Sequence, residues 1–338
     1  MRVITSMNNF QQIPWDDITE FGQKTLLNTD LFTVSWILAR FCNYNCSYCW
    51  PYARSSTPDH QDLEVYTRTI DNIKAQARDN GFTDFHFSFS GGEPTAYKYF
   101  GEVIDHYCSD TAPKYQSIHM TTNLSPGSKW WNRWLESTST LQRRSITASY
   151  HAEFASEQEF GDKCLQLMKG GTFVTINQVM VPEMFEELYG RLERFAARGI
   201  NVTLKPQSDP TASYVVHGYT EGQITRMQTG FPQRIPEEFE QLIPILGVEL
   251  IDKNGNKHLL DQAERFNAFG FNKFKGWECN AGYQGCVIRE NEVKRSYSCK
   301  DQPLGTLNEG FELFKAPSKC ITPTCVSSAD SKIPKRKV

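Results

Sequence analysis

The chain has 338 residues, of which 39% are hydrophobic and 22% are charged, so it can bury a sizeable core and is not expected to be disordered. The formal net charge of -3 removes the general electrostatic case for a nucleic-acid binder. The longest mostly apolar stretch, Phe32 to Phe41, is too short to cross a bilayer, and no signal-peptide pattern precedes it. We therefore expect a soluble, cytoplasmic protein with neither a membrane nor a nucleic-acid partner.

Strand-like and helix-like segments alternate between residues 32 and 206. The expected strands are rich in β-branched and aromatic residues, and they cover 32–38, 83–89, 117–121, 144–150, 172–181 and 201–205. The expected helices between them cover 62–80, 97–108, a Trp-rich stretch from 129, 157–168 and 183–198. Repeated strand–helix units imply a parallel sheet covered by helices, with a site in the loops after the carboxyl ends of the strands.

Three of the ten cysteines lie in the loop after the first expected strand. Cys42, Cys46 and Cys49 have the spacing C-x3-C-x2-C. Three thiolates on a short loop can hold three corners of a [4Fe–4S] cube and leave the fourth iron open to a small chelating molecule. A zinc site with His60 as the fourth ligand is the alternative, although structural zinc usually uses C-x2-C pairs.

Polar and glycine-rich residues follow several of the other expected strands. Gly91-Gly92-Glu93-Pro94 follows the second strand. Its glycines allow the backbone to approach a ligand closely, its proline fixes the turn, and its glutamate can accept hydrogen bonds from an ammonium group or brace the loop. Read alone, the segment is an ordinary strand-to-helix turn. The later strand ends carry Asn123, Ser149, His151 and Lys205.

The cysteine loop and the glycine turn together resemble the radical S-adenosylmethionine (SAM) superfamily. Its signature is C-x3-C-x-aromatic-C, with Tyr48 in the aromatic position here, and a GGEP motif after the second strand, as at residues 91–94. The resemblance extends over roughly residues 32–206. It implies an α/β fold of the partial (β/α)6 barrel type.

The resemblance also implies the chemistry. In the superfamily, SAM chelates the open iron of a [4Fe–4S] cluster, and one electron cleaves a C–S bond to give a 5′-deoxyadenosyl radical, which abstracts a hydrogen atom from the substrate. Cys42, Cys46 and Cys49 would hold this cluster, and a flavodoxin- or ferredoxin-type protein would donate the electron. The residues implied to contact SAM are Tyr48, Gly91, Gly92, Glu93, Pro94, Asn123 and Ser149.

Two further residues are candidates for the substrate side of the site. His151 should share the side of Ser149 and could face the substrate, or it could merely satisfy the loop. Lys205 could bind an anionic substrate group, or it could be a solvated charge at the rim.

A second group of cysteines lies near the C-terminal end: Cys279, Cys286, Cys299, Cys320 and Cys325. With its C-x-A-G and Leu-Gly-x-Leu segments it resembles the auxiliary-cluster region of SPASM and twitch-type radical SAM enzymes, although Glu292-Val293 departs from their usual Gly-Val turn. The resemblance implies one auxiliary [4Fe–4S] cluster, with the ligands Cys279, Cys299, Cys320 and Cys325.

Two alternatives stay open for this second group. Cys286 is interpreted as a buried free thiol, although it could replace one of the four ligands. A zinc ribbon is the alternative for the whole group, but it lacks the C-x2-C pairs typical of that structure.

These features predict five segments: an N-terminal extension (1–31), a radical SAM partial barrel (32–206), a connector (207–275), an auxiliary iron–sulfur domain (276–327) and a basic tail (328–338). The tail is expected to be a frayed, solvated end. The leading hypothesis is a radical SAM enzyme that acts on a small molecule, a sugar or nucleotide, or a peptide.

A ribosomal-peptide maturase is the alternative within this class, and the short segment before residue 32 argues mildly against it. A non-catalytic iron–sulfur protein and a zinc-binding interaction protein are hypotheses from other classes. A bare cluster carrier has no need of the GGEP turn.

Overall fold

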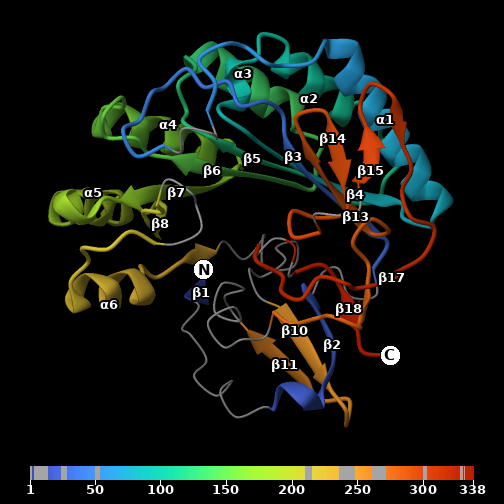
Figure 1. Ribbon diagram of the computed structural model, residues 1–338. Coiled ribbons are helices and arrows are strands. Elements are labelled where there is room, and N and C mark those ends of the chain that lie inside the picture. Colours follow the sequence, from blue (N-terminus) through green and yellow to red (C-terminus); the bar gives the residue numbers. More distant parts are fainter. Residues whose placement is uncertain are drawn as a thin grey trace.

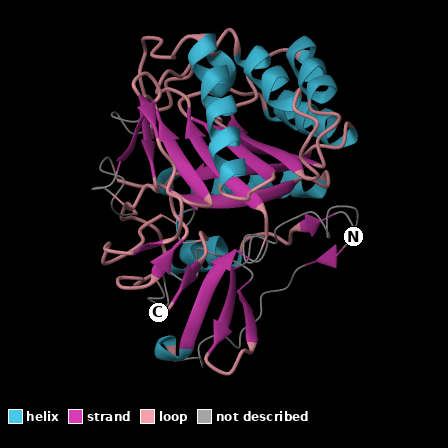
Figure 2. Ribbon diagram, turned by 90° about the vertical axis from the view of Figure 1, so that its right-hand side faces the viewer, coloured by secondary structure: helices cyan, strands magenta, loops and turns pink. Residues whose placement is uncertain are grey.

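The computed structural model (Figure 1) describes residues 2–3, 14–23, 29–49, 54–209, 215–235, 248–260, 272–299, 303–327, 330 and 332–338. Within them, a ten-stranded sheet carries helices over one face, and a six-stranded sheet lies beyond the other face, as Figure 2 shows from the side. A two-stranded ladder joins β1 (Arg2–Val3) to β9 (Arg234–Ile235). No helix among the described residues is long and apolar enough to cross a membrane.

Six parallel strands in chain order form one side of the large sheet, with β8 at its edge: β3 (Leu31–Ile37), β4 (Asp84–Ser90), β5 (Gln116–Thr122), β6 (Arg143–Ser149), β7 (Phe173–Met180) and β8 (Asn201–Pro206). The helices that alternate with them are α1 (Leu63–Asp79), α2 (Phe100–Cys108), α3 (Ser128–Ser137), α4 (Glu157–Lys169) and α5 (Phe185–Ala197). The predicted parallel sheet with its covering helices is confirmed, and each strand ends within one residue of its expected position.

The two faces of these strands differ in chemistry, because successive side chains of a strand point to opposite faces. Trp36, Phe87, Met120 and other apolar side chains are buried under the helices and form the main core. The opposite face is polar. We call it the polar face, and it comprises His86, Ser88, Ser90, Ser117, His119, Thr121, Arg143, Ser145, Thr147, Ser149, Thr175, Asn177, Thr203 and Lys205.

The C-terminal part of the chain extends the large sheet beside β3. β13 (Gly285–Arg289) pairs in parallel with β3, and a Cβ at Gly285 would lie only 2.6 Å from the Thr33 hydroxyl. The antiparallel strands that continue the sheet are β14 (Glu292–Lys294), β15 (Pro303–Thr306) and β16 (Gly310–Phe311). Segments far apart in the sequence therefore share one sheet.

The smaller sheet combines both ends of the chain with the connector. Its strands, in order, are β11 (Lys257–Leu260), β10 (Val248–Asp252), β2 (Ile18–Gln23), β18 (Lys335–Arg336), β12 (Glu278–Cys279) and β17 (Ser318–Lys319). The connector also contains α6 (Glu221–Thr229), which begins with a capping box formed by Thr220 and Gln223. Residues 276–327 are thus divided between the two sheets.

The expectation of a frayed, solvated tail is wrong. The backbone of β18 pairs with both β2 and β12, and Lys335 is only 2% exposed. The Lys335 ammonium donates to the carbonyls of Asp330 (2.9 Å) and Ile333 (2.8 Å). Local composition suggested a charged end, but backbone pairing with distant strands fixes it.

Candidate functional site

The first cysteine group lies in the loop after β3, at the carboxyl edge of the parallel strands. Cys46 is buried, Cys42 is half-buried and Cys49 is exposed. The Asp59 carboxylate fixes the start of the loop, because it accepts hydrogen bonds from the backbone N–H groups of Arg40 (3.1 Å) and Phe41 (2.9 Å). These contacts hold the three thiols on a short, anchored segment.

The thiols of this loop influence one another. Burial raises the pKa of Cys46 to about 12, with further increases from Glu153, Cys42 and Cys49. Burial also raises the pKa of Cys42. Thiols in such surroundings resist deprotonation unless a positive charge compensates them, and bound iron supplies that charge. The donor set therefore fits an iron–sulfur cluster.

Within the described ranges, no three or more His, Cys, Asp or Glu side chains are placed so that they could bind one single metal ion. Each thiolate of a [4Fe–4S] cube binds a different iron, so its ligands need not converge on one point.

The glycine turn after β4 packs directly on the strand end that leads into the cysteine loop. Gly92 N–H donates to the Ala39 carbonyl, and Glu93 N–H donates to the Phe41 carbonyl, both over 2.9 Å. A Cβ at Gly92 would lie 2.1 Å from the Phe41 carbonyl oxygen. Gly91 has a φ of +152°, and its Cβ would lie 2.6 Å from the Ala39 carbonyl oxygen. The glycines thus permit contact between two protein loops.

Glu93 is 2% exposed, and both of its carboxylate oxygens accept hydrogen bonds from neighbouring residues. Oε1 accepts from Thr95 N–H (3.0 Å), the Thr95 hydroxyl (2.6 Å) and the Thr122 hydroxyl (2.7 Å). Oε2 accepts from Asn123 N–H (2.6 Å). Burial raises the pKa of Glu93, and these hydrogen bonds offset only part of the rise. Of its two predicted roles, the geometry is that of a brace between the ends of β4 and β5. Pro94, which is also buried, begins the short 3-10 turn that follows.

Asn123 continues this brace to the cysteine loop. Its side-chain amide donates to Asn43 Oδ1 over 2.9 Å, and Asn43 lies between the first two cysteines. Its own Oδ1 accepts from Ser125 N–H over 2.9 Å. The ends of β3, β4 and β5 are therefore joined through polar contacts that are buried or partly buried.

The loop after β6 packs on the cysteine loop from another side. The Tyr48 hydroxyl lies 2.8 Å from His151 Nδ1, and the two rings are stacked. Glu153 accepts hydrogen bonds from the N–H (3.0 Å) and hydroxyl (2.6 Å) of Ser47. Burial lowers the pKa of His151 to about 4, so the ring is neutral at pH 7. The sequence did not indicate this contact, although Tyr48 and His151 were each singled out.

Ser149 and Lys205 lie on the polar face near the carboxyl ends of their strands. Ser149 is half-buried and lies in register with Asn177 of β7. Lys205 is exposed, yet the protein around it lowers its pKa by desolvation. Solvent reaches this ammonium group, but the surrounding protein removes part of its hydration.

Four of the C-terminal cysteines lie in and beside the smaller core. Cys279, Cys320 and Cys325 are buried there, next to Phe274 and Trp277. Burial is the main cause that raises the pKa of Cys325 to about 12; Lys335 opposes the rise, and the charges of Cys279 and Cys320 add to it. Cys299 and Cys279 likewise raise the pKa of Cys320. Each of the four thiols therefore lies within electrostatic range of at least one other.

Asp330 joins the segments that carry Cys299 and Cys325. Its carboxylate accepts hydrogen bonds from the N–H and the hydroxyl of Ser298, both over 2.7 Å. The same hydroxyl accepts from Val326 N–H over 3.0 Å. Asp330 is 2% exposed, and no sequence pattern predicted its position here.

Cys286 lies apart from these four thiols. It is on β13, in register with Val34 of β3, and belongs to the main core. Burial alone raises its pKa to about 12, without a contribution from another thiol.

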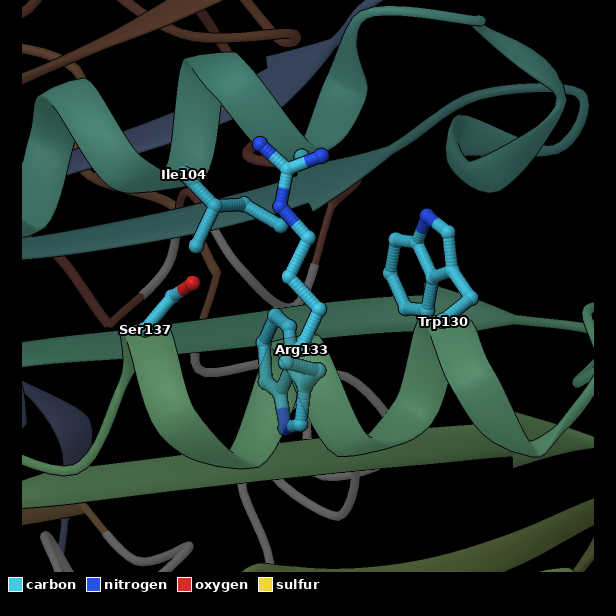
Figure 3. Close-up of a pocket in the computed structure, with 6 residues that line it drawn as sticks. Ile104, Trp130, Arg133 and Ser137 are labelled. Atoms are coloured by element: carbon cyan, nitrogen blue, oxygen red, sulfur yellow. The ribbon is translucent and has the colours of Figure 1, made fainter.

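The groove shown in Figure 3 lies on the helical side of the large sheet. It lies between α2 and α3, and its lining residues are Gly101, Ile104, Trp130, Arg133, Trp134 and Ser137. The Arg133 guanidinium lies over Gly101 and binds the Asp105 carboxylate at 2.6 Å. This groove is a gap in helix packing and contains none of the predicted site residues.

Comparisons with known proteins agree with this architecture. Residues 36–144 match a family model described as the radical SAM superfamily. The structure is similar to anSMEcpe with bound AdoMet and Kp18Cys peptide (TM-score 0.52, 13% identity, 83% of this chain and 79% of that chain). It is also similar to native anSMEcpe with bound AdoMet (TM-score 0.52, 15% identity, the same coverage). At such identities the likeness shows a common fold.

BtrN in complex with AdoMet and 2-DOIA matches less well (TM-score 0.32, 14% identity, 63% of this chain and 85% of that chain) and carries no argument. No curated protein matches the chain in sequence.

Proposed function

We propose that this protein is a radical SAM enzyme, since residues 36–144 match the family model, and that Cys42, Cys46 and Cys49 hold the [4Fe–4S] cluster at which SAM is cleaved. Bound there, the cluster and SAM supply an electron and a 5′-deoxyadenosyl radical that takes a hydrogen atom from the substrate. The observation that carries the proposal is the anchored loop of three thiols, which the ends of β4, β5 and β6 contact.

The residues around this loop would keep it in shape and bind SAM. Glu93 and Asn123 brace the loop, and His151 positions the Tyr48 ring beside it. We assign the SAM contacts to the exposed side of the glycine turn at residues 91–94, to Tyr48 and to Ser149. Lys205 is the candidate for binding an anionic substrate group. We take the six parallel strands, whose order does not close on itself, as a partial (β/α)6 barrel.

We assign an auxiliary [4Fe–4S] cluster to Cys279, Cys299, Cys320 and Cys325. The mutual influence of these thiols and the separate location of Cys286 support this set. Four protein ligands would leave no open iron, which favours electron transfer or structural support over direct substrate binding.

The first test removes the SAM-site ligands. Replacing Cys42, Cys46 and Cys49 together with Ala should abolish reductive formation of 5′-deoxyadenosine and lower the iron content from about eight to about four per chain. The matched control is Cys164→Ala, which removes a core thiol of α4. It should retain 5′-deoxyadenosine formation and the iron content of the wild type. Continued 5′-deoxyadenosine formation by the triple variant would refute the assignment.

The second test concerns the auxiliary ligands. Cys320→Ala should lose about four irons per chain, whereas Cys286→Ala should keep about eight. If well-reconstituted wild-type protein holds only about four irons, the auxiliary cluster is wrong and a zinc site becomes the first alternative.

The substrate is a small molecule, a sugar or nucleotide, or a peptide, and a flavodoxin- or ferredoxin-type protein is the proposed electron donor. A ribosomal-peptide maturase is the second candidate, favoured by the fold shared with anSMEcpe, which was crystallised with a peptide. Anaerobic incubation with SAM, reductant and either a metabolite or a peptide extract, followed by mass spectrometry, distinguishes the two.

A further inference from the structure

The end of the polar face that is farther from the cysteine loop carries a half-buried cation, Arg143. Arg143 is the first residue of β6, and the register places it beside Ser117 of β5, which lies beside His86 of β4. These three residues form one row across adjacent strands, at the amino end of the sheet. The SAM-site loops follow the opposite, carboxyl ends of the same strands.

Arg143 has no acidic partner among the described residues. Its Nε is buried and makes no hydrogen bond, and the Tyr115 phenol is the partner that influences its pKa. The nearby Asp84 carboxylate instead accepts a hydrogen bond from Tyr115 N–H over 3.0 Å. A guanidinium stays protonated at all physiological pH values, so this charge is uncompensated within the described part of the protein.

Neutral donors and a second cation lie around this guanidinium. His86 Nδ1 is 2.8 Å from the Ser117 hydroxyl, and His119 Nδ1 is 2.9 Å from the Ser145 hydroxyl. Burial and the charge of Arg143 lower the pKa of both histidines to about 3. The charge of Lys332, from the C-terminal segment, also acts on His119.

The polar face between this end and the cysteine loop offers hydroxyl groups. Ser88, Ser90 and Thr121 are half-buried, and their side chains make no hydrogen bond to any described residue. Water satisfies such groups in the free protein, and a polar ligand can replace that water.

We propose that Arg143, with His86 and Ser117, binds an anionic oxygen group of the substrate, a carboxylate or a phosphate. This inference rests on the proposed function, because it places the substrate between the SAM site and the far end of the polar face. Ser149 lies six positions after Arg143 along β6, which corresponds to a span of about 20 Å. The substrate is therefore an elongated, hydrogen-bonding anion, and compact or apolar molecules do not fit this arrangement.

Binding of small anions to the anaerobically reconstituted full chain tests the proposal. Equilibrium dialysis with labelled inorganic phosphate and with labelled acetate, at constant ionic strength set by chloride, should show saturable binding of at least one probe. Phosphate binding alone indicates a phosphorylated substrate, and acetate binding alone indicates a carboxylate. Arg143→Gln should weaken this binding at least about tenfold, and Arg143→Lys should weaken it less.

The matched control is Arg194→Gln, which removes the same charge from an exposed guanidinium paired with Glu157 at 2.7 Å and should leave anion binding unchanged. If circular dichroism shows that Arg143→Gln is misfolded, His86→Ala replaces it and should weaken binding severalfold. Absence of saturable binding of both probes, or equal binding by wild type and the folded variants, overturns the proposal.

Reductive SAM cleavage by the wild type without substrate is measured separately. Cleavage without anion binding overturns this inference and leaves the proposed function intact. Anion binding without cleavage overturns the proposed function.

Discussion

Glu93 accepts several hydrogen bonds with one buried carboxylate, so we expect the arrangement of the loops at the proposed SAM site to depend on it. In Glu93→Gln, one oxygen becomes an NH2 donor that faces another donor, whichever way the amide is turned. We expect a loss of about 1–3 kcal/mol in the free energy of unfolding, measured with urea, and weaker SAM binding. The exposed Glu136→Gln is the control. Equal stability of the two variants would contradict the brace.

His86 and His119 make stability depend on pH. Burial lowers the pKa of each to about 3, below the unfolded value, so the unfolded chain binds more protons between these two pKa values. Their contribution is fully present above about pH 6.5 and is lost as the pH falls toward the folded pKa, by up to about 1.4 kcal/mol per pH unit for each ring. His86→Asn should reduce the slope of unfolding free energy against pH between about 6 and 4. An unchanged slope would mean that His86 is not buried in neutral form.

Asp330 holds the segments that carry Cys299 and Cys325 through its hydrogen bonds to Ser298, which neighbours Cys299 and contacts Val326. Asp330→Asn keeps the size of the side chain and weakens its bonds to the N–H and hydroxyl of Ser298. We expect the iron content to fall toward about four per chain while SAM-dependent 5′-deoxyadenosine formation persists. Asp79→Asn, at an exposed position on α1, should keep full iron content. Full iron content in Asp330→Asn would show that Ser298 needs no anchor.

At the scale of elements, the glycine turn and the cysteine loop act as one unit. Gly92→Ala would place a Cβ 2.1 Å from the Phe41 carbonyl oxygen. This oxygen belongs to the backbone, so it cannot rotate away as a side chain could. We expect a loss of at least about 2 kcal/mol in unfolding free energy, together with poorer cluster incorporation. Gly190→Ala, in the middle of α5 with its nearest contact at 3.6 Å, should be neutral or stabilising. Similar stability in both variants would argue against the close packing of the two loops.

The strands and helices of the parallel sheet were predictable because their signals are local. Alternating or continuous apolar runs predicted β3 to β8. The order of these strands then predicted that the cysteine loop and the glycine turn lie together at the carboxyl edge of the sheet. The pairing partners of β2, β13 and β18 were not predictable, because short strands have no period and their partners lie far away in the sequence. For the same reason, the Tyr48–His151 contact and the position of Asp330 emerge only in three dimensions.

At the scale of the whole molecule, β18 pairs with β2 and with β12, and β12 carries Cys279. Deletion of residues 335–338 removes β18 from between β2 and β12, the strand that carries Cys279. We expect a lower thermal midpoint and loss of about four irons per chain. The double variant Arg336→Ala and Lys337→Ala removes charge but keeps the backbone, so it should behave like the wild type. Full iron content after the deletion would contradict a structural role for the tail.

β3 pairs with β4 on one side and with β13 on the other, and β13 comes much later in the sequence. The Gln284 side chain, just before β13, donates to the Leu31 carbonyl across a sequence separation of 253 residues. During synthesis, β3 and the cysteine loop are made before β13, so the edge of β3 that β13 covers stays open until residues 285–289 have also been made. Such an edge can pair with other chains, and contacts this distant in sequence form slowly. Chains that are truncated before residue 285 leave this edge open, and we expect them to aggregate more readily than the full chain.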